Sequence, residues 1–433
     1  MILLIIFLIL SISFGLSYII GKDKFSPSKL LLSLWFMAIA VAQLRLSPYE
    51  NPWTLKFWLI LGLFFTIFVF IYLVSARMWQ KKLKEQSDLA PANSKLWLIL
   101  IIIMAIASII TNIYIFYRFG TLPILSSSPD KMRFIINRDI FGLWEYASLL
   151  PRLFIPLTFI YFLQFNPKKW LKALLITTII LGFILLSFYA SRLVIIFPIL
   201  ICYFSYLIIK IKEINLKKII LASVSVVVVV LAISIAIPAF RQSITYRDYL
   251  DPSAQDDPFG YIAKISGLRI PKSLNFIVPI YIIPSFNLQA LMKATDLYDG
   301  SNFYYGKYDL AVFNPALKLI HQPEIEFKIP WDKILLPWWV TATFLFSYWI
   351  DFGYMGIILA GVFWGILLSG LYIWAKKKPS LLSVMLFAYF SFTVIMSIYT
   401  NYFLRPELYM DVVAVIVIGL IARAHKFSPK RFQ

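Results

Sequence analysis

Long apolar runs are the feature that most constrains how this chain can fold. Stretches such as Ile2–Ile20 and Ile219–Ile237 reach the length that an α-helix needs to cross the hydrocarbon core of a bilayer. Hydrophobic residues occupy 61% of the 433 positions and charged residues only 14%, a composition far from that of soluble domains. The sequence therefore predicts an all-α polytopic membrane protein.

About eleven segments, with a range of about 10–13, are predicted to be transmembrane helices. They cover residues 2–20, 29–46, 55–76, 96–117, 144–164, 171–189, 191–209, 217–238, 352–375, 380–399 and 407–424. Connections after odd-numbered spans carry most of the lysines, and those after even-numbered spans carry few. Because positive charge marks the cytoplasmic side, we expect a multi-pass protein of the cell (inner or plasma) membrane with its N-terminus outside and its C-terminus cytoplasmic. Residues 1–433 are predicted to form a single membrane-embedded domain.

Two connections on the predicted outer side are long. Residues 118–143 form the first, in which Gly, Pro and Ser interrupt any helix. Residues 239–351 form the second, between spans eight and nine, and its many aromatic residues argue against disorder. We expect this large outer loop to bear short helices. Within it, the apolar segment 274–292 contains two prolines, so we expect an interfacial or re-entrant piece there rather than a full span.

The net charge of +20 does not indicate a nucleic-acid-binding protein. Most of the excess lies in short lysine runs beside apolar spans, where orientation in the membrane explains it. Cys202 is the only cysteine, lies in an apolar span and is predicted to be a packing residue. The sequence contains no His/Cys metal constellation, phosphate-binding loop or serine-hydrolase motif.

The arginines are distributed differently from the lysines. Ten of the 13 arginines fall on the predicted outer face. Guanidinium is suited to planar, bidentate capture of phosphate, so an outward arginine cluster at the membrane surface suggests a site for a lipid-linked phosphate or pyrophosphate. The alternatives are snorkelling or helix capping for Arg192 and pairing with nearby aspartates for the arginines beyond span eight. The candidates for pyrophosphate binding are Arg192, Arg241, Arg247 and Arg269, with Arg133, Arg138 and Arg152 in or beside the first long connection as further candidates.

The large loop also offers several candidates for a group that accepts or donates a proton. His321 lies in LKLIHQPEIEF beside Glu324 and Glu326, and histidine is suited to accept a proton from a hydroxyl near neutral pH. Asp351 opens DFGYMG at the outer end of span nine. The alternative for His321 is a structural loop residue. For Asp351, and for Asp411 in the last span, it is a helix-end carboxylate favoured by the N-terminal dipole.

Three stretches carry a family resemblance. They are FGTLPILS (119–126), YASRLVIIFPI (189–199) and TATFLFSYWIDFGYMGIILAGVFWGILLSGLY (341–372), the last with an aromatic-Asp-Phe-Gly turn that leads into a Gly-containing span. Together with the late, long outer loop, they resemble the oligosaccharide repeat unit polymerases, the Wzy-type O-antigen polymerases. Paired arginine–glycine motifs described for some members are absent from the outer loops, so roles attached to those motifs are not carried over.

The resemblance implies a membrane glycosyltransferase that polymerises undecaprenyl-pyrophosphate-linked repeat units of the O-antigen, capsule or exopolysaccharide type by en bloc transfer on the outer leaflet. It implies a metal-independent enzyme without a cofactor, with arginines on the pyrophosphate and His321, Glu324 or Asp351 as the base. The expected partners are lipid-linked oligosaccharides, membrane lipids and a chain-length regulator, and no nucleic acid. Two alternatives are an O-antigen ligase-type transferase and a lipid-linked oligosaccharide flippase or other transporter.

Overall fold

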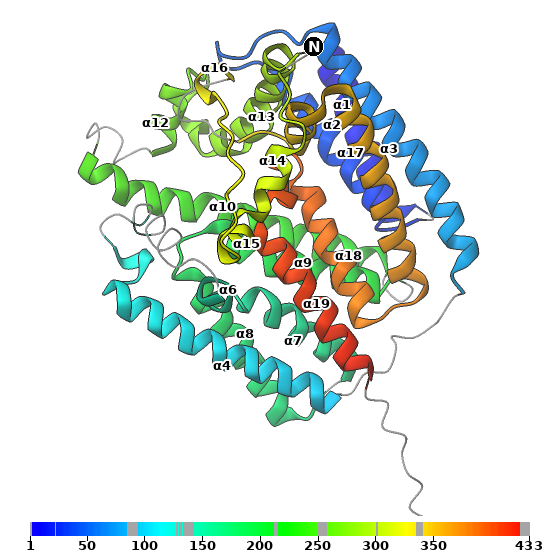
Figure 1. Cartoon of the computed structure of the whole chain (residues 1–433), viewed down its shortest axis with the longest axis vertical. Helices are drawn as coiled ribbons and strands as arrows, with labels where there is room; N and C mark the ends of the chain where they lie inside the picture. Colours follow the sequence, from blue (N-terminus) through cyan, green and yellow to red (C-terminus); the bar gives the residue numbers. More distant parts are fainter. Residues whose placement is uncertain are drawn as a thin grey trace, which may run out of the picture. The chain divides into compact units, whose positions relative to one another are not determined.

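The computed structural model describes most of the chain: residues 2–21, 23–84, 94–126, 129, 132, 143–165, 167–211, 215–249, 258–299, 302–334 and 341–424. Every regular element in those ranges is helical, and they contain no strand (Figure 1). The predicted all-α class is therefore confirmed for the described part of the chain.

Nine helical runs in the described residues are long and apolar enough to cross a membrane, which supports a polytopic membrane protein. Two further apolar helices are shorter, α2 (Pro27–Ala42) and α18 (Leu381–Met396), and α19 (Pro406–Ala424) covers the last predicted span. The exact number of spans and the orientation of the termini stay predictions. The nine runs contain α1 (Ile2–Ile20), α3 (Leu55–Lys82), α4 (Ser94–Phe119), α7 (Pro151–Phe165), α8 (Lys169–Ser187), α9 (Arg192–Ile209), α10 (Leu216–Tyr249), α13 (Val278–Leu297) and α17 (Phe344–Lys377).

The segment expected to be interfacial or re-entrant, 274–292, is helical throughout, and its place in the membrane stays a prediction. It belongs to a helical run, Lys272–Leu297, that is long and apolar enough to span a membrane. Pro279 falls in the first turn of α13, where a proline removes no intrahelical hydrogen bond, and only Pro284 lies inside the helix. Two prolines therefore interrupt this helix less than the sequence suggests.

The two long connections contain short helices in their described parts. The large connection begins with the last turns of α10 and continues through α12 (Pro258–Ile265) to the start of α17. The short helices between α13 and α17 are α14 (Lys307–Leu310), η3 (Ala311–Phe313), α15 (Asn314–Leu319) and α16 (Trp331–Ile334). In the first connection, η1 (Pro123–Leu125) and α6 (Leu143–Ser148) are described, whereas Arg133 and Arg138 lie outside the described residues.

The chain forms two compact units, each assembled from segments far apart in the sequence. Unit 1 comprises Met1–Lys82, Tyr249–Ile373 and Phe390–Leu408, and so contains α1, α2, α3, α13 and most of α17. Unit 2 comprises Leu83–Asp248, Trp374–Tyr389 and Tyr409–Gln433, and so contains α4, α6–α9 and nearly all of α10.

Close backbone packing joins α3 to α17 within unit 1, where the two helices run side by side (Figure 1). A Cβ atom at Gly361 would lie 2.8 Å from Ile67 Cγ2, and one at Gly365 would lie 2.9 Å from Ile71 Cγ2. Lipid supplies no hydrophobic force between membrane helices, so they associate through close packing of their surfaces. Small residues four positions apart allow this close approach. This contact fixes the part of α17 beyond its midpoint against α3.

Candidate functional site

A break in α17 is the most unusual backbone feature of unit 1. Gly353 has φ 56° and ψ −133°, so the helix stops at Asp351–Gly353 and restarts beyond it. Only glycine adopts such a conformation readily. A Cβ atom at Gly353 would also lie 2.5 Å from Cζ of Phe303. The DFG sequence that opens the predicted ninth span is therefore an interruption inside a longer helix.

A loop from earlier in the chain supplies the hydrogen bonds that the break removes. The Tyr304 N–H donates to the Ile350 carbonyl at 2.9 Å, and the Tyr305 N–H donates to the Asp351 carbonyl at 3.0 Å. Carbonyl groups at a helix interruption have no intrahelical partner, and leaving them unpaired in an apolar environment is costly. Residues 304–309 thus complete the broken helix.

Asp351 is fully buried and bonded through its carboxylate to the same loop. Its Oδ1 accepts the Tyr308 N–H at 3.1 Å, and its Oδ2 accepts the Asp309 N–H at 2.9 Å. These amides belong to α14, so Asp351 binds the backbone of that short helix. The sequence placed it as a helix-end carboxylate or a base; in the structure it holds α14 against the break.

Asp309 is the second carboxyl group of this site. Burial, followed by repulsion from Asp351, raises the pKa of Asp309 to about 7, and the nearby Ser347 hydroxyl counteracts this only in part. Its Oδ1 atom is buried and has no hydrogen-bond partner among the described residues. A pair of close carboxyl groups in which one is bonded and the other titrates near neutral pH is a common arrangement for acid–base chemistry. We call Asp309 and Asp351 the acid pair.

Two polar side chains from the segment after α18, Asn401 and Arg405, interact with neighbours of the acid pair. Asn401 donates to the Ser347 hydroxyl at 2.7 Å, and both residues are almost fully buried. Arg405 is exposed, and its charge acts on Tyr308 next to Asp309. Burial raises the pKa of Tyr308, and the Arg405 charge lowers it in part. The site therefore combines two carboxyl groups with one exposed guanidinium.

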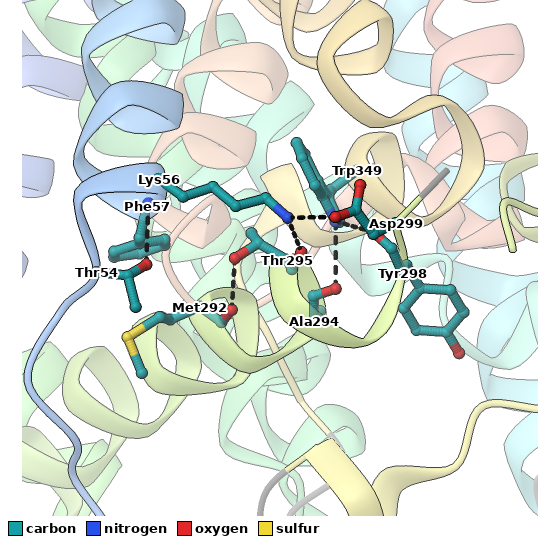
Figure 2. A network of polar contacts seen from close by, with 9 residues as sticks. All are labelled: Thr54, Lys56, Phe57, Met292, Ala294, Thr295, Tyr298, Asp299 and Trp349. Carbon is teal, nitrogen blue, oxygen red and sulfur yellow. Dashed lines mark hydrogen bonds and ion pairs between the residues drawn. The ribbon is translucent and has the colours of Figure 1, made fainter. Parts of the chain in front are cut away.

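The end of α13 holds the first part of α17 in place, as Figure 2 shows. The Trp349 indole N–H lies 3.2 Å from the carbonyls of both Ala294 and Tyr298. From α3, Lys56 donates to the Thr295 carbonyl at 2.6 Å and pairs with Asp299 at 3.1 Å. Cationic and N–H donors satisfy the last carbonyls of a helix and suit its negative end. The end of α13 thus fixes the side chain of Trp349, two residues before Asp351.

Two other residues that the sequence predicts as bases, His321 and Glu324, are not hydrogen-bonded to the acid pair within the described part of the chain. His321 has φ 56° and follows the C-terminus of α15. Its N–H donates to the Lys318 carbonyl, and the Gln322 N–H donates to the Leu317 carbonyl. This is a Schellman ending, in which a left-handed residue closes a helix. His321 and Glu324 are exposed, and neither forms a hydrogen bond or ion pair with Asp351 in the described structure.

The predicted pyrophosphate ligands are distributed over both units. Arg192 begins α9 in unit 2, is half-buried, and lies 3.5 Å from the Ser234 carbonyl through its Nη1 atom. Arg241 and Arg247 lie in the last turns of α10, where only the backbone is described. Arg269 in unit 1 is exposed, and its backbone N–H donates to a carbonyl of the α2–α3 connection. Their convergence on one site stays a prediction.

A further arginine of the predicted outer face, Arg152, forms an ion pair with a carboxylate. Arg152, at the start of α7, pairs with Asp411 of α19 at 2.7 Å, with side chains 5% and 2% exposed. The guanidinium also lies over the Phe197 ring, 4.4 Å from its centroid. A buried charge is tolerated when it is paired and bonded. Asp411 is therefore an ion-pair partner rather than only a helix-end carboxylate, and Arg152 is bound within unit 2.

The described residues contain no group of three or more His, Cys, Asp or Glu that could hold a metal ion. Cys202 packs against the apolar cluster around Phe154 and Leu186, as the sequence predicts for a packing residue. No protein-family model, curated protein or solved structure matches this chain.

Proposed function

We propose that this protein is a membrane glycosyltransferase that polymerises undecaprenyl-pyrophosphate-linked oligosaccharide repeat units by en bloc transfer on the outer leaflet. The observation that carries the proposal is the acid pair at the break of α17, where Asp309 titrates near neutral pH. A general base works best when its pKa lies near the operating pH. The resemblance of residues 119–126, 189–199 and 341–372 to repeat unit polymerases supports the same substrate class.

In this mechanism Asp309 accepts the proton of an acceptor sugar hydroxyl, and Asp351 holds α14 so that the base stays in position. The hydroxyl oxygen attacks the anomeric carbon of the donor and forms the new glycosidic bond. The bond from that carbon to the pyrophosphate oxygen breaks, and the pyrophosphate leaves with the electron pair. Arg405, whose charge acts on Tyr308 next to Asp309, is the first candidate to stabilise the developing negative charge, with Arg192, Arg241, Arg247 and Arg269 as further candidates.

The break of α17 also favours a second candidate function. Discontinuous helices form the substrate sites of many secondary transporters, and a carboxyl group that titrates near neutral pH suits proton coupling. A proton-coupled carrier of lipid-linked oligosaccharide would use the same residues without forming a glycosidic bond. The two functions differ in their product: a transferase lengthens the glycan, whereas a carrier only moves it.

Reconstitution of the full-length protein into vesicles with lipid-pyrophosphate-linked repeat units tests the proposal. The expected product is a ladder of chain lengths that requires no second acceptor, which a ligase would need. Asp309→Asn should abolish the ladder, and Asp332→Asn, at an exposed aspartate of α16, should leave it intact. His321→Ala should also leave it intact, because that side chain lies outside the acid pair. Transport of repeat units without any ladder would refute the polymerase and support the carrier.

A further inference from the structure

Tyr305 presents an exposed aromatic ring at the acid pair. Its ring belongs to a residue that is 67% exposed, and its backbone N–H donates to the Asp351 carbonyl at 3.0 Å. Asp309 lies four residues further along the same loop. Most large aromatic side chains gain stability by burial, and this one does not.

The backbone of Tyr305 is strained, with φ 50°. A left-handed conformation is uncommon for a bulky residue, and glycine or asparagine would occupy this position with less strain. The following residue, Gly306, has φ 88° and lies against the Phe352 ring, so a Cβ atom there would come within 3.2 Å of it. Residues held in sparsely populated backbone conformations cluster at functional sites.

The backbone that carries the ring is held in position. Residues 304, 305, 308 and 309 each donate a backbone N–H to Ile350 or Asp351, so the loop is bonded on both sides of Tyr305. A surface that is already fixed loses little conformational entropy when a ligand binds. The neighbouring Tyr304 ring is bonded through its hydroxyl to the Lys328 carbonyl, which leaves Tyr305 as the ring that faces outward from this turn.

We propose that Tyr305 is the stacking platform that binds the acceptor sugar next to the acid pair. The electron-rich face of an aromatic ring attracts the C–H face of a pyranose, and the ring hydroxyl adds a hydrogen-bonding group at its edge. This inference rests on the proposed glycosyl transfer for the identity of its ligand. It predicts that binding depends on the ring and not on the backbone conformation.

Substitutions at Tyr305 separate these contributions. Tyr305→Gly removes the ring and relieves the strain, so the protein should unfold at the same temperature as wild type or a higher one. Tyr305→Phe and Tyr305→Trp retain a stacking face. Tyr117→Ala removes a tyrosine that is 86% exposed at the end of α4 and serves as the matched control.

The test uses the full-length protein in lipid nanodiscs and, as its probe, the oligosaccharide released by mild acid from the lipid-linked pool of the producing cells. Binding is measured by saturation-transfer NMR, and turnover by the KM for the acceptor. Tyr305→Gly should weaken binding and raise KM by roughly tenfold or more with little change in kcat, whereas Phe, Trp and the Tyr117→Ala control should stay within about threefold of wild type.

Each outcome decides the inference separately from the proposed function. A wild-type ladder with unchanged binding and KM in Tyr305→Gly overturns the platform and leaves the polymerase standing. Absence of a ladder, with probe binding that Tyr305→Gly abolishes, supports the platform and overturns the polymerase. Wild-type protein that does not bind the probe overturns the platform, and a ring that only contacts lipid headgroups would give that result.

Discussion

Replacing Asp309 by asparagine should make the protein more stable at alkaline pH and inactive at every pH. The folded protein binds a proton at Asp309 up to about pH 7, whereas an unfolded aspartate releases it near pH 4. Between those two values the folded state holds the extra proton, so stability falls as pH rises through this window and becomes constant above it. Asparagine is neutral throughout and removes this loss.

The magnitude follows from the rise in the pKa of Asp309. At about 1.4 kcal/mol for each pH unit, a rise from about 4 to about 7 corresponds to about 4 kcal/mol at pH 8. This is an upper limit, because Asp309 as a whole residue is half-buried and solvent screens part of its charge. An unfolding entropy of about 2.1 cal/mol/K per residue gives about 0.9 kcal/mol per kelvin for 433 residues. The Tm of Asp309→Asn at pH 8 should therefore exceed that of wild type by up to about 4 °C.

Thermal unfolding in the same detergent at pH 5 and pH 8 provides the assay. The difference between Asp309→Asn and wild type should be much smaller at pH 5, and the exposed control Asp332→Asn should show no difference at either pH. Wild-type activity should rise with pH through about 7, as the base loses its proton. An Asp309→Asn protein that is equally destabilised at pH 5 and pH 8 would refute the reasoning, because the site would then need an ionised carboxylate to fold.

Three further substitutions test the contribution of the α17 break and of two ion pairs to stability. Gly353→Ala should lower the free energy of unfolding by about 2–3 kcal/mol and abolish activity, whereas Gly62→Ala, where a Cβ atom meets nothing within 4 Å, should change stability by at most about 1 kcal/mol in denaturant titrations. Lys56→Met should cost less than about 1 kcal/mol by the same measurement, since the carboxylate it pairs with is 71% exposed. Arg152→Ala should cost about 3–5 kcal/mol by removing the guanidinium that balances the buried charge of Asp411, and the double variant Arg152→Met/Asp411→Leu should recover most of that loss of thermal stability.

The helical architecture could be predicted because a bilayer permits few alternatives. Apolar length alone located α1, α3 and α4 to within a few residues in the described chain, apart from the C-terminal extension of α3 to Lys82. The start of α17 could not be predicted in the same way. Polar residues such as Ser347 and Asp351 lower the hydropathy of its first turns, so an apolar pattern does not reveal them. Hydrogen bonds to distant segments offset the free energy of burying these polar groups.

The candidate site was predictable only in part. DFG indicated a turn, and Asp351 was identified as a candidate from that motif. Asp309 carries no sequence signal: it approaches Asp351 because backbone N–H groups of its loop bond to the α17 break, and any residue supplies such groups. His321 shows the opposite case, since Pro323 shortly after a helical segment is a signal for a helix end that could have been recognised.

The bonding of residues 304–309 to the α17 break also sets an order of events during synthesis. The donor loop leaves the ribosome before Ile350 and Asp351 exist, so four of its amide groups have no acceptors until the start of α17 has been made. A chain arrested before that point therefore carries an unfinished loop however well its earlier helices have inserted. The unbonded loop 304–309 is a local difference that a quality-control protease could recognise in an arrested chain and would not find in a finished one.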